Sequence, residues 1–255
     1  MTVHVRPCIT RPRGCAARTA FVGRLLAVLT GVLSWAWSTA SSAQVGTTLS
    51  LYNDVRFRGY SLSEGRPALF VDLSYDGRSG FYASVSGSAS LGARDRPRPL
   101  AVELTAGYTK RISPGLTLDI GIDHTDYARR SSIGPGKSYT AAYAGLSYKF
   151  LSSRVSLSPH YFGAGVMTAY GELNANVSPA RLWGIDGHVG LLVSLHRGRG
   201  SDDAGSEHDW RVGITRSLGR VSLRAVWTGG GPSDDYYRDR VRSKNKLVFG
   251  LIYAL

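Results

Sequence analysis

Cysteine is scarce in this sequence. Cys8 and Cys15 are the only two in 255 residues, and both lie near the N-terminus. The rest of the chain therefore cannot form a disulfide framework or a cysteine-ligated metal site. The absence of thiols also suits a chain that crosses an oxidising periplasm before it folds.

Long apolar runs are missing as well. Beyond the N-terminal segment, no stretch approaches the roughly 18 to 20 consecutive apolar residues of a membrane-spanning helix. Charged residues make up 19% and apolar residues 43% of the chain, which is not the composition of a disordered protein. Glycine and tyrosine are plentiful instead, with 31 and 14 residues. This combination favours many short strands and tight turns over a helical bundle, where each interior glycine costs about 1 kcal/mol.

Acidic residues are absent from the first 43 positions, which contain five arginines. A short apolar run follows at residues 25–37, and then Ser41 and Ala43, spaced as a signal peptidase site requires. This order predicts a secretory signal peptide over residues 1–43. The remaining chain has 26 basic and 18 acidic residues, a net charge of +8. No nucleic-acid recognition motif accompanies that charge, so we expect no nucleic-acid partner.

Residues 44–255 repeatedly alternate between apolar and polar side chains, the period-two pattern of a strand with two different faces. In residues 81–91, apolar residues and glycine fall on one face, and Tyr82 and four serines on the other. The pattern predicts an all-β, antiparallel transmembrane β-barrel of about 12 strands. The predicted strands are residues 49–57, 69–76, 81–91, 100–111, 116–125, 138–150, 155–166, 170–177, 182–196, 209–217, 221–228 and 245–255.

The predicted connections alternate in length. Short turns are expected at residues 77–79, 113–115, 151–154, 178–181 and 218–220. The others are longer and polar, apart from a short one near residues 167–169. Outer-membrane barrels have short periplasmic turns and longer extracellular loops, and an even strand count places both termini on the periplasmic side.

A soluble β-sandwich is the competing fold. Its core would need bulky apolar filling, whereas the polar faces here consist largely of Ser, Thr, Asp, Glu and Arg, which suit a water-filled lumen. The last strand favours the membrane fold, because apolar and aromatic side chains alternate to the final residue, as the barrel-assembly machinery requires of its clients. These residues are Leu247, Phe249, Leu251, Tyr253 and Leu255.

Residues 52–90 resemble the N-terminal signature of the TorF family of porins (Gcw_chp outer-membrane proteins). Its core reads aromatic-x-RG-x-S-x-S-(D/E)-G-x-P-A, followed by a strand, a turn and GFY. The matching positions are Phe57, Arg58, Gly59, Ser61, Ser63, Glu64, Gly65, Pro67, Ala68, Gly80, Phe81 and Tyr82. Weaker likenesses follow at residues 138–150, 170–177 and 188–190. The resemblance implies an outer-membrane barrel with pore function and poorly defined substrates. The chain departs from the family at Ala141, where an acid is frequent, and in its long basic loops.

A porin needs a polar lumen and rings of charge. The residues that we expect to line the pore are Arg56, Arg58, Glu103, Arg111, Asp119, Asp123, Glu172, Asp186, Arg211 and Arg224. We expect passive diffusion of small hydrophilic solutes with a weak preference for anions. The near balance of signs also allows a paired network that narrows or plugs the pore. Arg58, beside Gly59, is either part of a turn that orients the first loop or a charge at the constriction.

Two non-porin functions stay open. A structural or surface barrel would use its loops, whose arginines suit lipopolysaccharide phosphates: Arg94, Arg96, Arg98, Arg129, Arg130, Arg238, Arg240 and Arg242. A lipid-acting barrel hydrolase would need a Ser, a His and an orienting group. The available histidines, His124, His160, His188 and His196, show no His-x-Ser spacing.

We therefore predict no enzyme activity, no cofactor and no metal site. Two acidic loop clusters are interpreted as solvated rather than cation-binding: Asp202, Asp203, Glu207 and Asp209, and Asp234 and Asp235.

Overall fold

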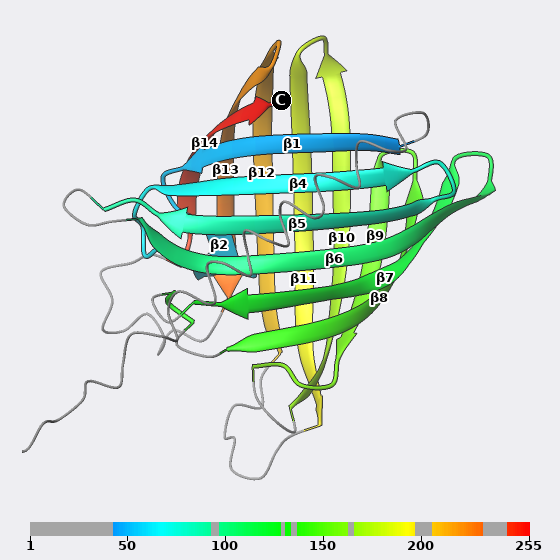
Figure 1. Cartoon of the computed structure of the whole chain (residues 1–255), viewed down its shortest axis with the longest axis horizontal. Coiled ribbons are helices and arrows are strands. Elements are labelled where there is room, and N and C mark those ends of the chain that lie inside the picture. The colour runs from blue at the N-terminus through cyan, green and yellow to red at the C-terminus, as the bar shows by residue number, and fades with distance from the viewer. Residues whose placement is uncertain are drawn as a thin grey trace, which may run out of the picture. The chain divides into compact units, whose positions relative to one another are not determined.

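The computed structural model describes residues 43–92, 97–128, 131–133, 137–162, 166–196, 206–231 and 244–255. Within them, twelve antiparallel strands follow one another in sequence order and close into a barrel, with β1 beside β14 (Figure 1). They are β1 (Ala43–Tyr52), β4 (Ala68–Gly77), β5 (Phe81–Ser90), β6 (Arg98–Ser113), β7 (Leu116–Tyr127), β8 (Ser138–Tyr148), β9 (Leu151–Ser158), β10 (Met167–Ala180), β11 (Trp183–His196), β12 (Glu207–Leu218), β13 (Val221–Gly231) and β14 (Lys246–Ala254). A separate hairpin pairs β2 (Arg56–Phe57) with β3 (Tyr60–Ser61).

The prediction of an antiparallel barrel of about twelve strands is confirmed. In the described residues, no helix has the length and apolar character that a membrane crossing requires. The predicted signal peptide and its cleavage site lie outside the described residues, apart from Ala43.

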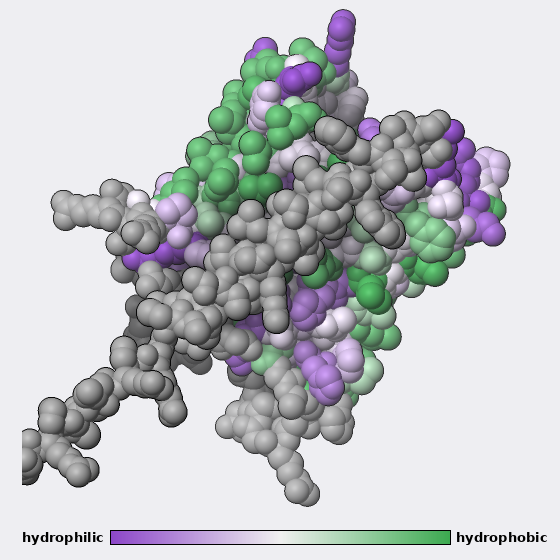
Figure 2. Space-filling view, viewed as in Figure 1, coloured by the Kyte–Doolittle hydropathy of each residue, from purple (hydrophilic) through white to green (hydrophobic). Residues whose placement is uncertain are grey.

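The barrel wall has the two faces that the alternation predicts. Its outer face is apolar and exposed, as at Phe81 (62% exposed), Ile122 (56%) and Phe249 (54%). Hydrophobic residues accordingly cover much of the visible outer wall in Figure 2. The inner face is polar and enclosed, since Ser86, Ser88 and Ser90 are buried on the same strand as Phe81. This reversal of the soluble pattern is that of a barrel surrounded by lipid.

The alternation is interrupted at the start of β6, where the predicted strand 100–111 would place Leu100 on the outer face with Val102 and Leu104. Leu100 is almost fully buried instead of exposed. Ser88 pairs with Ala101 but the next residue, Ala89, pairs with Pro99, so β6 carries an extra residue there. Such a bulge shifts the alternation by one position, and Leu100 turns into the barrel.

Two predicted strands differ most from the observed limits. The strand predicted at 49–57 ends at Tyr52, because the next fifteen residues connect β1 to β4 and contain the β2–β3 hairpin. The strand predicted at 155–166 is β9, which begins at Leu151 directly after a two-residue turn. Lys149 makes that turn with a φ of +52°, so the expected turn at 151–154 is part of the strand.

The alternation of short turns and longer connections is confirmed. The five short turns occupy residues 78–80, 114–115, 149–150, 181–182 and 219–220, all at one end of the barrel. The connection expected near residues 167–169 is wrong, because these residues belong to β10 and the chain connects β9 to β10 over residues 159–166. Every connection at the other end of the barrel is therefore longer than the five short turns.

Candidate functional site

The β2–β3 hairpin crosses the mouth of the barrel at its long-loop end. On one side, Arg56 donates a hydrogen bond from Nη1 to the carbonyl oxygen of Lys244, two residues before β14, at 2.8 Å. On the other, Arg58 lies over the rings of Tyr139 in β8 and Tyr170 in β10. Since β14 and β8 are six positions apart in a ring of twelve strands, the hairpin spans the full width of the mouth.

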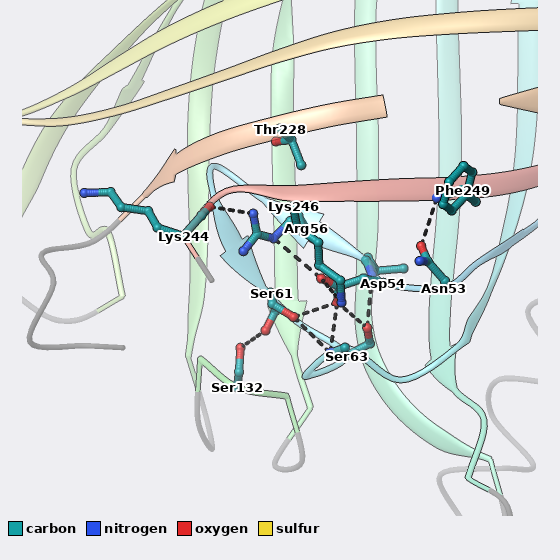
Figure 3. A network of polar contacts seen from close by, with 12 residues as sticks. Asn53, Asp54, Arg56, Ser61, Ser63, Ser132, Thr228, Lys244, Lys246 and Phe249 are labelled. Carbon is teal, nitrogen blue, oxygen red and sulfur yellow. Dashed lines mark hydrogen bonds and ion pairs between the residues drawn. The ribbon is translucent and has the colours of Figure 1, made fainter. Parts of the chain in front are cut away.

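Asp54 fixes the base of this hairpin (Figure 3). Its Oδ1 accepts hydrogen bonds from Ser61 Oγ at 2.6 Å, Ser63 Oγ at 2.9 Å and Gly65 N at 3.0 Å. Its Oδ2 lies 3.4 Å from Lys246 Nζ in β14 and 3.6 Å from Arg56 Nε. The Asp54 side chain is 1% exposed, so its carboxylate has lost its water, and these partners compensate for that loss.

The residues that follow tie the hairpin to other elements. Ser132, between β7 and β8, donates from Oγ to the carbonyl oxygen of Ser61 at 2.6 Å. Tyr60 donates from its hydroxyl to the carboxylate of Glu207 at the start of β12, at 3.0 Å. Gly59 has a φ of +82°, and a Cβ there would lie 2.4 Å from the backbone nitrogen of Gly231. The turn therefore needs glycine both for its conformation and for its close approach to β13.

Arg58 occupies the centre of an aromatic cluster. Its guanidinium carbon lies 3.8 Å from the ring centroid of Tyr170, and between 5.0 and 5.4 Å from Phe57, Tyr139 and Tyr161. Burial disfavours the charge on Arg58, but the phenol oxygens of Tyr161 and Tyr139 raise its pKa overall, so the cation persists. Burial likewise raises the pKa of the Tyr161 phenol. A guanidinium that lies against aromatic rings in a site with little water makes a strong cation–π interaction.

The position of Arg58 bears on both interpretations of this residue. It is part of a turn, with a φ of +45°, and its side chain points into the mouth of the barrel. A hydrophobic cluster surrounds it, with Val55 and Leu62 from the connection and Leu100, Tyr127 and Leu192 from the barrel wall among its members. The long-loop end is therefore filled by side chains in this structure.

Two arginine–aspartate pairs lie deeper in the lumen. Arg154 in β9 donates from Nη2 to Asp119 in β7 at 2.8 Å, and its guanidinium lies 4.2 Å from the ring centroid of Tyr143. Asp119 also accepts a hydrogen bond from Tyr82 at 2.6 Å. Arg224 in β13 donates from Nη2 to Asp186 in β11 at 2.7 Å.

The Arg224–Asp186 pair reaches across the intervening strand β12. Gly213 makes this possible, since a Cβ there would lie 2.5 Å from an Asp186 carboxylate oxygen. The side chains of Arg224 and Asp186 are 26% and 14% exposed, which shows that the lumen wall at this depth is only partly shielded.

A third polar group is buried between β10, β11 and β12. Asp209 accepts a hydrogen bond from Tyr170 at 3.0 Å and lies 2.9 Å from His188 Nε2. The other ring nitrogen, Nδ1, is 2.7 Å from Asn174 Oδ1. Because Tyr170 also contacts Arg58, this group connects the aromatic cluster to the wall of the barrel.

The residues predicted to line the pore fall into three groups. Arg56 and Arg58 lie in the hairpin and not on a barrel strand. Asp119, Asp186 and Arg224 form the pairs described above. The other five lie on strands and share the inward face with the buried serines or the paired aspartates: Glu103, Arg111, Asp123, Glu172 and Arg211.

Within that last group, Arg111 and Arg211 are exposed, whereas the three acids are partly buried. Glu103 interacts electrostatically with Asp123 and Arg58, and Asp123 with Glu172. The sequence prediction missed Arg154, because residues 151–154 were assigned to a turn. Beginning that strand four residues earlier would have placed Arg154 on the inner face with Ser156 and Ser158.

The structure brings the aliphatic hydroxyl of Thr140, an imidazole and a carboxylate together on the outer face. Thr140 Oγ1 lies 2.8 Å from His124 Nδ1, and His124 Nε2 lies 3.3 Å from Asp126. Thr140 and His124 are directly paired in the β7–β8 ladder, where backbone N–H groups bond to the neighbouring strand. An acyl-transfer site also needs free donors for the oxyanion, which a regular ladder does not supply.

The acidic clusters and loop arginines are only partly described. Asp202, Asp203, Asp234 and Asp235 lie outside the described residues, as do all the named loop arginines except Arg98, which begins β6. Among the described residues, no three His, Cys, Asp or Glu side chains gather as a metal site would need.

A closed barrel with an apolar outer wall and a polar inner face has the fold of outer-membrane porins. Three solved structures share this fold. The NanC porin superposes with a TM-score of 0.54 at 11% identity, covering 82% of this chain and 100% of its own. The outer membrane channel COG4313 from Pseudomonas putida F1 gives 0.51 at 12% identity, with 84% and 94% covered. The KdgM porin gives 0.50 at 9% identity, with 82% and 98% covered.

The chain itself belongs to the family described as "Bacterial protein of unknown function (Gcw_chp)", whose model matches residues 36–249. No curated protein matches the sequence. The likeness to the TorF porins stays a prediction made from the motif at residues 52–90.

Proposed function

We propose that this protein is a porin-like channel of the outer membrane that passes small hydrophilic solutes by diffusion. The observation that carries the proposal is the polar inner face of the barrel below the hydrophobic cluster, with ion pairs such as Asp119–Arg154 and Asp186–Arg224 partly exposed to the lumen. Fixed charges along a polar wall stabilise water and solutes inside a pore.

The hairpin β2–β3 is the gate of this proposed channel. It closes the long-loop end through Arg58, Asp54 and Tyr60, so solutes pass only when it moves aside. The hairpin belongs to a connection and makes no ladder with the barrel strands, so its displacement leaves the barrel's hydrogen bonds intact.

Weak anion preference is part of the proposal. The net charge of +8 outside the first 43 residues favours anions. Exposed bases such as Arg111 and Arg211 share the inner face, while Glu103, Asp123 and Glu172 oppose them. The preference is therefore expected to be small, and it is measured as the reversal potential in a salt gradient.

Planar-bilayer recording tests the channel directly. We expect brief, discrete conductance steps from the refolded wild-type protein. A folded barrel that stays silent, both as wild type and with the hairpin loosened, would contradict the channel. A non-conducting surface barrel is the second candidate, and the filled mouth is the observation in its favour.

Export and assembly complete the proposal. The basic and apolar segment at residues 1–43 is proposed to direct secretion. The closing strand β14 presents Leu247, Phe249 and Leu251 outward, each at least 45% exposed, as a client of the assembly machinery would. Basic loop residues are proposed to contact lipopolysaccharide phosphates.

A further inference from the structure

The short-turn end of the barrel is strongly basic. Within three residues of the five short turns lie six exposed basic residues and one acidic residue, Asp76. The six are Arg78, Arg111, Lys149, Arg181, Arg216 and Arg220. The solute pathway does not need most of them, because Arg78, Lys149, Arg181 and Arg220 lie in the turns and Arg216 lies on the outer face, in step with Ile214 and Leu218.

Aromatic side chains accompany these bases on the outer wall. Tyr75, Phe81, Tyr148, Phe150 and Trp183 are between 37% and 62% exposed. Two bases pack directly on this girdle, since Lys149 Nζ lies 5.1 Å from the Tyr148 ring centroid and the Arg216 guanidinium 5.2 Å from that of Trp183. Aromatic girdles mark the level of lipid headgroups in outer-membrane barrels.

We infer that this basic rim binds anionic phospholipid headgroups. The bases lie at headgroup level, where their chemistry matches phosphate, and the single acid leaves the rim with a positive charge that zwitterionic lipid does not neutralise. Among the described residues of the opposite end, two acids, Glu64 and Asp126, are exposed or partly exposed beside the bases Arg66 and Lys137. The bases of the short turns, packed on the aromatic girdle, therefore assign the anionic lipid to the leaflet that the short turns face.

Tryptophan fluorescence can measure lipid preference at each end separately. Trp183 lies at the short-turn rim, whereas Trp210 and Trp227 form an edge-to-face pair in the half of β12 and β13 toward the long loops. One reporter keeps Trp183 and carries Trp210→Phe and Trp227→Phe. The other carries Trp183→Phe. Both also carry Trp35→Phe and Trp37→Phe, and each is refolded into vesicles of brominated phosphatidylglycerol mixed with phosphatidylcholine, or the reverse.

At Trp183 we expect brominated phosphatidylglycerol to quench as though bound about fivefold more tightly than phosphatidylcholine, which is the effect of roughly one headgroup-level base. The preference should disappear in Lys149→Gln/Arg216→Gln and weaken in high salt. The matched control Lys137→Gln/Arg66→Gln loses the same charges at the other end and should keep it.

Equal quenching by both lipids at Trp183 would overturn the inference and direct attention to an acidic soluble partner. So would a preference of the same size at Trp210 and Trp227, or one that the rim variant leaves unchanged. Heat-modifiable migration on gels confirms that each variant is folded. None of these readouts depends on conductance, so they stand or fall apart from the channel proposal.

Discussion

Replacing Arg58 with alanine should shift the proposed gate, the β2–β3 hairpin, toward its open state. The guanidinium lies 3.8 Å from the Tyr170 ring centroid, close to contact, and more loosely over three further rings at 5.0 to 5.4 Å. A desolvated cation–π contact contributes about 2 kcal/mol, and the looser ones add a fraction of that. A loss of about 2 to 3 kcal/mol raises the open-to-closed ratio roughly 30- to 150-fold.

Single-channel recording in planar bilayers measures this ratio as the fraction of time spent open. Arg58→Lys keeps the charge but not the flat guanidinium, so an intermediate effect is expected. Arg66→Ala is the matched control, because Arg66 is an exposed arginine of the same connection and should leave the open fraction unchanged. An Arg58→Ala protein that is folded, conducts, and opens as rarely as wild type would refute the assignment of this hairpin as the gate.

Four further outcomes follow from the same geometry. Gly59→Ala places a Cβ about where the Gly231 backbone stands, so it should also raise the open fraction in bilayer recordings. Asp209→Ala strips two buried partners of their carboxylate and should lower the free energy of unfolding by about 3 kcal/mol, measured by urea titration in vesicles. Ile122→Arg puts a charge on the lipid face and should cost about 2 to 4 kcal/mol by the same titration, whereas Thr215→Arg on the inner face should cost less than 1. Arg154→Gln leaves the lumen one cation poorer, so the reversal potential should move toward cations; no movement would exclude this residue from the pathway.

The barrel wall could be predicted from the sequence because lipid imposes a strict rule on it. On every strand, apolar residues such as Ile122 and Phe249 must face the lipid. The resulting period of two shows where each strand lies, which of its faces is outside, and how many strands there are. The hairpin escaped prediction for the same reason. Val55 and Phe57 continue the alternation of β1, yet they pack inside the mouth, and a period of two does not distinguish a strand facing lipid from one facing a protein interior.

The polar contacts of the lumen required the register. Asp186 and Arg224 were both expected to face the pore, but they lie 38 positions apart on strands separated by β12, and their pairing depends on the tilt of the strands and on Gly213. Asp54 illustrates the opposite limit. The predicted strand 49–57 would place its carboxylate on the polar face, whereas it is buried among serines of the signature motif, a position that only the folded connection defines.

The seam between β1 and β14 carries a consequence for the order of assembly. Thr48 pairs with Ala254 across almost the entire sequence, so this junction cannot form until the last strand is in place. The seating of the β2–β3 hairpin, the proposed gate, depends on the same junction, because Asn53 exchanges hydrogen bonds with Phe249 and Asp54 lies 3.4 Å from Lys246. Before β14 pairs with β1, the barrel therefore has neither a closed wall nor a bound hairpin. The pairing that closes the barrel also places the hairpin across its mouth.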